Sequence, residues 1–62
     1  MQASVMSYEE RNLSQGNDAE AIAIIELSVS DLPGSYFGVG IHTNSTTAAI
    51  LAVLSGLARI NN

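Results

Sequence analysis

Residues 35–60 read SYFGVGIHTNSTTAAILAVLSGLARI, and this stretch decides the fold. Apolar residues recur at every second position in its first part, which is typical of a β-strand. They are Phe37, Val39 and Ile41. Gly38 and Gly40 occupy the alternate positions, where the lack of a side chain lets another backbone or a ligand come close. We expect a strand over about residues 35–42.

The second part of this stretch predicts a helix over about residues 46–60. Side-chain oxygens that can accept hydrogen bonds from a helix start come first, in the run 43–46. Large apolar residues then recur at spacings of three and four, which is the pattern of an amphipathic helix. They are Ile50, Val53, Leu54, Leu57 and Ile60. Arg59 lies in the last turn, where a cation suits the helix dipole.

Another stripe of the same helix carries small residues where a surface helix would carry Lys and Glu. It comprises Ser45, Ala49, Ala52, Gly56 and Arg59. We expect Ala49, Ala52 and Gly56 to contact a second helix, because a domain of this size has too little surface to cover such a stripe alone. The alternative is a helix inside a larger core. Both interpretations require another chain or another domain.

Two more strands are expected before this stretch. Residues 19–29 are rich in β-branched Ile and contain no Gly or Pro, so they predict a strand whose two faces both carry isoleucine. Residues 4–13 favour a strand over a short helix. Regular alternation would place Val5, Ser7, Glu9 and Arg11 on one face and Met6, Tyr8, Glu10 and Asn12 on the other. Residues 14–18 are turn formers, and Pro33-Gly34 fits a type II turn.

Composition excludes several functions. The chain has 62 residues and a net charge of -4, with two Arg, no Lys and no Cys. Two cations are too few to neutralise a nucleic-acid backbone. His42 is the only residue of the histidine and cysteine types that usually bind a structural metal. We therefore expect neither nucleic acid, nor a metal, nor a cofactor. The longest apolar run is too short for a membrane span, and the lack of a leader and of cysteine suggests the cytoplasm.

The ordered motifs resemble one family. Phe37-Gly38-Val39-Gly40-Ile41 followed by Thr46-Thr47-Ala48 is similar to the end of the C-terminal regulatory domain of 2-isopropylmalate synthases and the related citramalate synthases. Ser7-Tyr8-Glu9-Glu10 and the run 16–21 resemble its opening strand and first loop. The resemblance covers about residues 3–60. It departs in the short connection 30–35 and in having one βββα unit where the family domain has two.

The resemblance implies an α+β unit, three antiparallel strands and a helix, paired with a second copy or docked on a synthase. It implies feedback sensing of leucine or another branched-chain amino acid, without catalysis by this unit. The residues at which it places the effector are Gly16, Asn17, Asp18, Ala19, Gly40, Thr43, Asn44, Ser45 and Thr46. N–H groups at the helix start can hold a carboxylate, and Asp18 can pair with an amino group. The alternative is a self-associating structural domain without a ligand.

Overall fold

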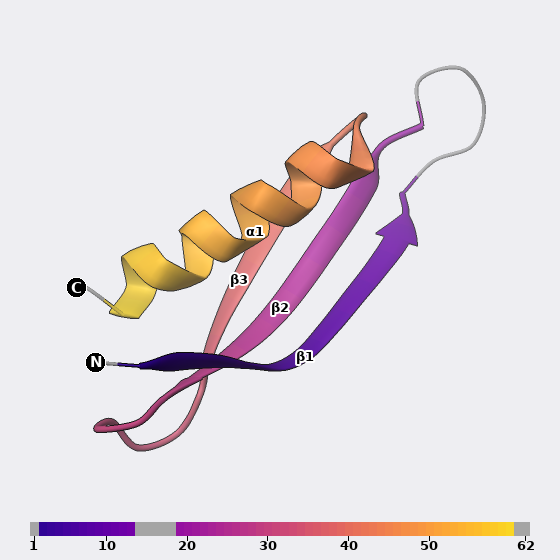
Figure 1. Ribbon diagram of the computed structural model, residues 1–62. Coiled ribbons are helices and arrows are strands. Elements are labelled where there is room, and N and C mark those ends of the chain that lie inside the picture. The colour runs from indigo at the N-terminus through magenta and orange to yellow at the C-terminus, as the bar shows by residue number, and fades with distance from the viewer. Residues whose placement is uncertain (1, 14–18, 61–62) are drawn as a thin grey trace.

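A computed structural model describes residues 2–13 and 19–60 of the chain. It contains β1 (Ala3–Asn12), β2 (Ala21–Val29), β3 (Tyr36–His42) and α1 (Ser45–Ile60), in that order. The strands form one antiparallel sheet in the order β1-β2-β3, and α1 lies across one face of it (Figure 1). The expected α+β class, with three antiparallel strands followed by a C-terminal helix, is confirmed.

The central strand β2 provides most of the core. Its residues alternate strictly between buried and half-buried positions, as expected for a strand with apolar residues on both faces. The buried set faces α1 and comprises Ala21, Ala23, Ile25, Leu27 and Val29. Ala48 and Ala52 of α1 complete this core, and Leu57 and Ile60 pack at its margin. Because most of these side chains are short, the helix and the sheet lie close together.

Glycines of β3 set this close approach. A Cβ atom on Gly38 would overlap the carbonyl oxygen of Ala52, and one on Gly40 would overlap that of Ala48. The helix therefore rests on the strand backbone with its small residues, and its three buried residues are Ala48, Ala52 and Gly56. This is the backbone approach expected at two strand glycines.

This packing corrects the expected orientation of α1. Ala52 and Gly56 were expected to meet a second helix, but they lie against the sheet of their own chain. Ala49 lies at the edge of the contact and is half-buried. Of the large apolar residues that periodicity placed on the main packing face, Ile50, Val53 and Leu54 are exposed instead, at 54, 36 and 57%. Leu57 and Ile60 remain half-buried at the margin of the core. Burying the face with the large apolar residues would gain more transfer free energy. Only the face with the small residues, however, fits closely against a strand backbone that carries two glycines.

Strand β1 departs from regular alternation. Its pairing with β2 shifts between Val5 and Ser7, which is a β-bulge at Met6. The register pairs Val5 with Leu27 and Tyr8 with Ile25, so both lie on the α1 face of the sheet. The expectation that Val5 shares a face with Ser7, Glu9 and Arg11 is therefore wrong. The bulge inserts one extra residue, so the residues that follow Met6 lie on the opposite faces from those that regular alternation after Val5 would give.

The turn between β2 and β3 has the expected backbone. Gly34 has φ of +77°, as the third position of a type II turn requires after Pro33. The β2–β3 turn lies at one end of the sheet, and the turn between β3 and α1 lies at the other (Figure 1). None of the helices in the described ranges is long and apolar enough to cross a membrane.

Candidate effector site and interface

The start of α1 is built around Asn44. Its side-chain Oδ1 accepts a hydrogen bond from the backbone N–H of Thr47 at 3.0 Å, and its carbonyl accepts one from the N–H of Ala48 at 2.9 Å. Asn44 is therefore the N-cap that the sequence predicts. The N–H groups of Ser45 and Thr46, in the first turn, have no acceptor within the helix. They point out of the helix start, where a carboxylate could be held.

His42 supports the same turn. Its Nδ1 accepts a hydrogen bond from the backbone N–H of Asn44 at 3.0 Å. The ring therefore acts as an acceptor at Nδ1, and this fixes the tautomer with the proton on Nε2. Its position in the strand pairs it with Ala21 of β2. The imidazole thus holds the turn that presents the cap, a role that the sequence did not predict.

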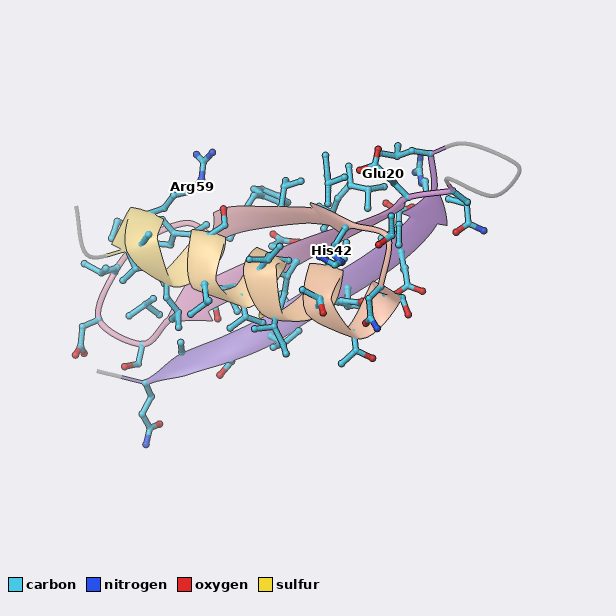
Figure 2. The ribbon with its side chains drawn as sticks, turned by 90° about the horizontal axis from the view of Figure 1, so that it is seen from above. Glu20, His42 and Arg59 are labelled. Carbon is cyan, nitrogen blue, oxygen red and sulfur yellow. The ribbon has the colours of Figure 1, made fainter. Side chains whose placement is uncertain are left out.

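The first loop opens at this same end of the molecule. Register pairs Asn12 with Ala21 and Ala21 with His42, so the neighbouring ends of all three strands lie side by side. The N–H of Leu13 donates to the carbonyl of Glu20 at 2.8 Å and closes the base of the loop. Glu20 lies at this end and Arg59 at the opposite end (Figure 2). Ala19 is half-buried here, whereas Gly16, Asn17 and Asp18 lie outside the described residues.

The remaining candidates divide into two groups. The residues Thr43, Asn44, Ser45 and Thr46 are all exposed at the helix start, where a ligand can reach them. Gly40 is buried under the helix, beside the carbonyl oxygen of Ala48 and the side chain of Leu51. Its lack of a side chain is explained by this packing. Contact of Gly40 with an effector stays a prediction.

A first apolar surface lies on the α1 side of the sheet. The helix packs on β2 and β3 and, among the described residues, does not contact β1. We call this uncovered region the helix-side surface, and its members are 36 to 61% exposed. It comprises Val5, Tyr8, Ile50, Val53 and Leu54.

The two flanks of α1 can be told apart by one contact. Ser55 Oγ accepts a hydrogen bond from the backbone N–H of Val39 at 3.3 Å, so this flank of the helix faces the outer edge of β3. Residues two positions apart on a helix point about 200° apart. Val53 therefore lies on the flank toward β1. The sequence could not predict this surface, because it depends on the bulge in β1 and on which face of α1 packs against the sheet.

Tyr8 has an altered environment within the helix-side surface. Its hydroxyl donates to Oε2 of Glu10 at 3.1 Å. The pKa of Tyr8 is raised above its usual value of 10.0, first by reduced solvation, then by the hydrogen bond to Glu10 and by the charge of that carboxylate. The phenol therefore holds the proton that it donates to Glu10 more tightly than an unperturbed tyrosine would.

A second apolar surface lies on the opposite face of the sheet. We call it the open sheet face; its β3 members are 42 to 50% exposed, and its β2 members are half-buried. It comprises Ile22, Ile24, Phe37, Val39 and Ile41. Glu26 closes one end of it, accepting hydrogen bonds from Ser7 Oγ at 3.2 Å and Ser35 Oγ at 2.7 Å. At the other end Arg11 donates to Glu9 at 2.7 Å.

Comparison with known proteins identifies the family. Residues 1–61 match the family model of the LeuA allosteric (dimerisation) domain. The chain is 52% identical over 58 residues to a 2-isopropylmalate synthase of Azoarcus sp. (strain BH72), covering 94% of this chain and 10% of that protein. It is 56% identical over 55 residues to the synthase of Herbaspirillum seropedicae (strain SmR1), covering 86% of this chain and 10% of that protein. The chain spans about a tenth of the length of these relatives, and it belongs to the LeuA allosteric (dimerisation) domain family.

Proposed function

We propose that this chain is the allosteric and dimerisation unit of a 2-isopropylmalate synthase and that it binds a branched-chain amino acid where α1 begins. The family description names both roles, and the relatives at about half identity are named as that synthase. The observation that carries the pairing is the helix-side surface, because a self-contained domain rarely leaves this much apolar surface in one place.

Pairing follows from the width of the sheet. Neighbouring strands lie about 4.8 Å apart, and a helix with its side chains is about 10 Å wide, so one helix covers only two strands. The α1 helix occupies the space above β2 and β3 and leaves β1 uncovered. A helix of a second copy fits above β1, against Val5 and Tyr8. A two-fold axis makes the contact reciprocal, with each helix covering the β1 strand of the other copy.

The effector would bind at the exposed helix start. Its carboxylate would accept hydrogen bonds from the N–H groups of Ser45 and Thr46, which the helix dipole also favours. Its ammonium group would pair with Asp18 of the first loop, by charge. Because residues 43–46 are exposed, the aliphatic side chain of the ligand would need cover from the second copy. This arrangement would couple effector binding to dimerisation, since the ligand stabilises only the paired form.

The chain would take no part in catalysis itself. Its single histidine uses Nδ1 to hold the backbone N–H of Asn44, so this atom has a structural role. Within the described ranges, no three His, Asp or Glu side chains gather as a metal-binding group. We propose that the condensation of an acyl-CoA with a 2-oxo acid, as the family implies, belongs to other parts of the synthase.

Sedimentation equilibrium of matched lysine variants tests the pairing. Val53→Lys places a charge on the flank toward β1, whereas Ala58→Lys places the same charge on an exposed position of the other flank. We expect Val53→Lys to lower the mean mass of the particle and Ala58→Lys to leave it unchanged. Equal masses for both variants and the wild type would contradict pairing through the helix-side surface. Pairing without any response to leucine or isoleucine would favour a purely structural domain.

A further inference from the structure

Asn44 joins β3 to α1 through three hydrogen bonds. On the strand side, its N–H donates to Nδ1 of His42 at 3.0 Å. On the helix side, its Oδ1 accepts the N–H of Thr47 at 3.0 Å, and its carbonyl accepts the N–H of Ala48 at 2.9 Å. The imidazole therefore holds the residue that caps the helix. It does so as a hydrogen-bond acceptor, and a proton on Nδ1 would remove this property.

Neutral and protonated imidazole differ at the atom that Asn44 uses. The neutral ring accepts a hydrogen bond at one nitrogen, whereas the protonated ring carries an N–H group at both nitrogens and accepts none. Protonation of His42 would therefore place a second donor against the N–H of Asn44 and break their hydrogen bond. The new positive charge would also oppose the dipole at the start of α1. Both effects loosen the turn in acid, and neither requires a ligand.

Among the described residues, no carboxylate forms an ion pair with the His42 ring. The one ion pair of those ranges joins Arg11 to Glu9, on the open sheet face. The row of His42 contains Ala21 and Asn12, and the first turn of α1 has no acidic residue. Carboxylates keep their charge down to about pH 4, so their state is constant while a histidine titrates. The other charged residues of the surrounding elements are Glu10, Asp18, Glu20, Glu26 and, at the far end of α1, Arg59 (Figure 2).

We propose that His42 is a pH-sensitive switch at the start of α1. The neutral ring holds Asn44 in its capping position, and protonation of the ring releases the turn that spans residues 42–47. The change stays local, because Ala48 is fully buried and its carbonyl lies against Gly40. Histidine is the type of side chain that ordinarily changes its charge between about pH 5 and 8, and the chain has one.

This switch would make effector binding depend on pH, a consequence that rests on the proposed function. The N–H groups of Ser45 and Thr46 can hold a carboxylate only while the first turn of α1 is formed. Release of that turn would therefore weaken effector binding in acid. A direct contact between the imidazolium and the carboxylate would instead strengthen binding in acid, by charge. The direction of the pH dependence thus distinguishes a ring that shapes the turn from a ring that contacts the ligand.

Amide resonances of the ligand-free chain test the switch itself. Between about pH 8 and pH 5.5, we expect the resonances of residues 43–48 to move together with those of the His42 ring. His42→Asn is the matched variant, because its side-chain oxygen can accept the same N–H but is not protonated in this range. It should keep the turn and lose the response, whereas His42→Leu should show a loosened turn at both pH values. Glu20→Gln, which removes a carboxylate at this end of the sheet, should respond as the wild type does.

Two results would overturn the switch. One is a wild-type chain in which residues 43–48 do not follow the titration of the ring, and the other is a His42→Asn chain that keeps the full response. Far-ultraviolet circular dichroism checks that each variant is folded.

Calorimetric titration of leucine at the same two pH values tests the coupling to the effector. We expect the wild type to bind leucine several-fold more weakly at the lower pH, and His42→Asn to bind it equally at both. Stronger binding of the wild type in acid, or the same pH dependence in both chains, would overturn the coupling. If the turn responds to pH but neither leucine nor isoleucine binds at either pH, the proposed effector site fails while the switch stands.

Discussion

Gly38 of β3 lies directly against the carbonyl oxygen of Ala52 in α1, where no Cβ atom could be placed on the strand. The same relationship recurs between Gly40, two residues further along β3, and the carbonyl oxygen of Ala48, one helix turn before Ala52. Together these contacts seat the helix on its small residues and leave Ile50, Val53 and Leu54 exposed. The exposed surface that we assign to pairing is thus a consequence of two glycines.

A Gly38→Ala substitution should be strongly destabilising. The new methyl group meets helix backbone, which cannot move without lifting α1 from the core. We expect the free energy of unfolding to fall by about 3 kcal/mol, at the upper end of overpacking effects. Urea denaturation followed by circular dichroism measures this change.

Gly56→Ala is the matched control for that substitution. Its methyl group approaches the end of the Leu27 side chain at 2.8 Å, and this side chain can rotate, while the Gly38 backbone lies at an ordinary contact distance of 3.7 Å. Alanine also favours a helix over glycine by about 1 kcal/mol. We expect a net change within about 1 kcal/mol of zero. Equal losses for the two variants would show that the helix is not seated on Gly38.

Asn44→Ala should weaken the start of α1. It removes the oxygen that accepts the N–H of Thr47, and the loss of such a cap costs about 1 kcal/mol. Asn44→Asp keeps an acceptor at the same place and should retain most of the stability. Thermal unfolding of the three chains distinguishes them, and an alanine variant as stable as the aspartate variant would rule out the cap.

The ionisation of Tyr8 gives a pH-dependent test. Because its pKa is raised above 10.0, the folded chain holds the phenolic proton more tightly than the unfolded chain does. Its contribution to stability is therefore complete below pH 10 and is lost as the pH rises through the folded pKa. Tyrosinate absorbance in a Tyr36→Phe chain reports Tyr8 alone. Glu10→Gln, which removes the neighbouring charge, should lower the midpoint, and a midpoint that does not move would contradict the contact.

Local patterns predict the fold well because each element has its own signal. The isoleucines of β2, the Pro33-Gly34 turn and the cap residues before α1 act within a few residues of the chain, and the structure has a strand, a turn and a helix there. The orientation of α1, by contrast, depends on a contact with another element and not on a local signal. Periodicity distinguishes the stripes of a helix, but only the position of the glycines on β3 decides which stripe faces the sheet.

The candidate site was predictable in part for the same reason. Adjacent strand ends bring Ala19 and the run 43–46 to one end of the molecule, as the family resemblance implies. The packing of Gly40 under α1 and the bulge at Met6 depend on contacts between elements, which alternation alone does not reveal. The roles of Val5 and Val53 in the helix-side surface follow from those two features.

Titration of leucine into the isotope-labelled chain, followed through its backbone amide resonances, tests the central claim most directly. Isoleucine serves as the comparison, because one rearranged methyl group changes binding in an apolar pocket only modestly. We predict saturable shifts that cluster at residues 19–21 and 42–47, with smaller shifts along β1 as pairing tightens. A folded, paired sample whose resonances do not respond to either amino acid would contradict the effector site and leave a domain that only assembles.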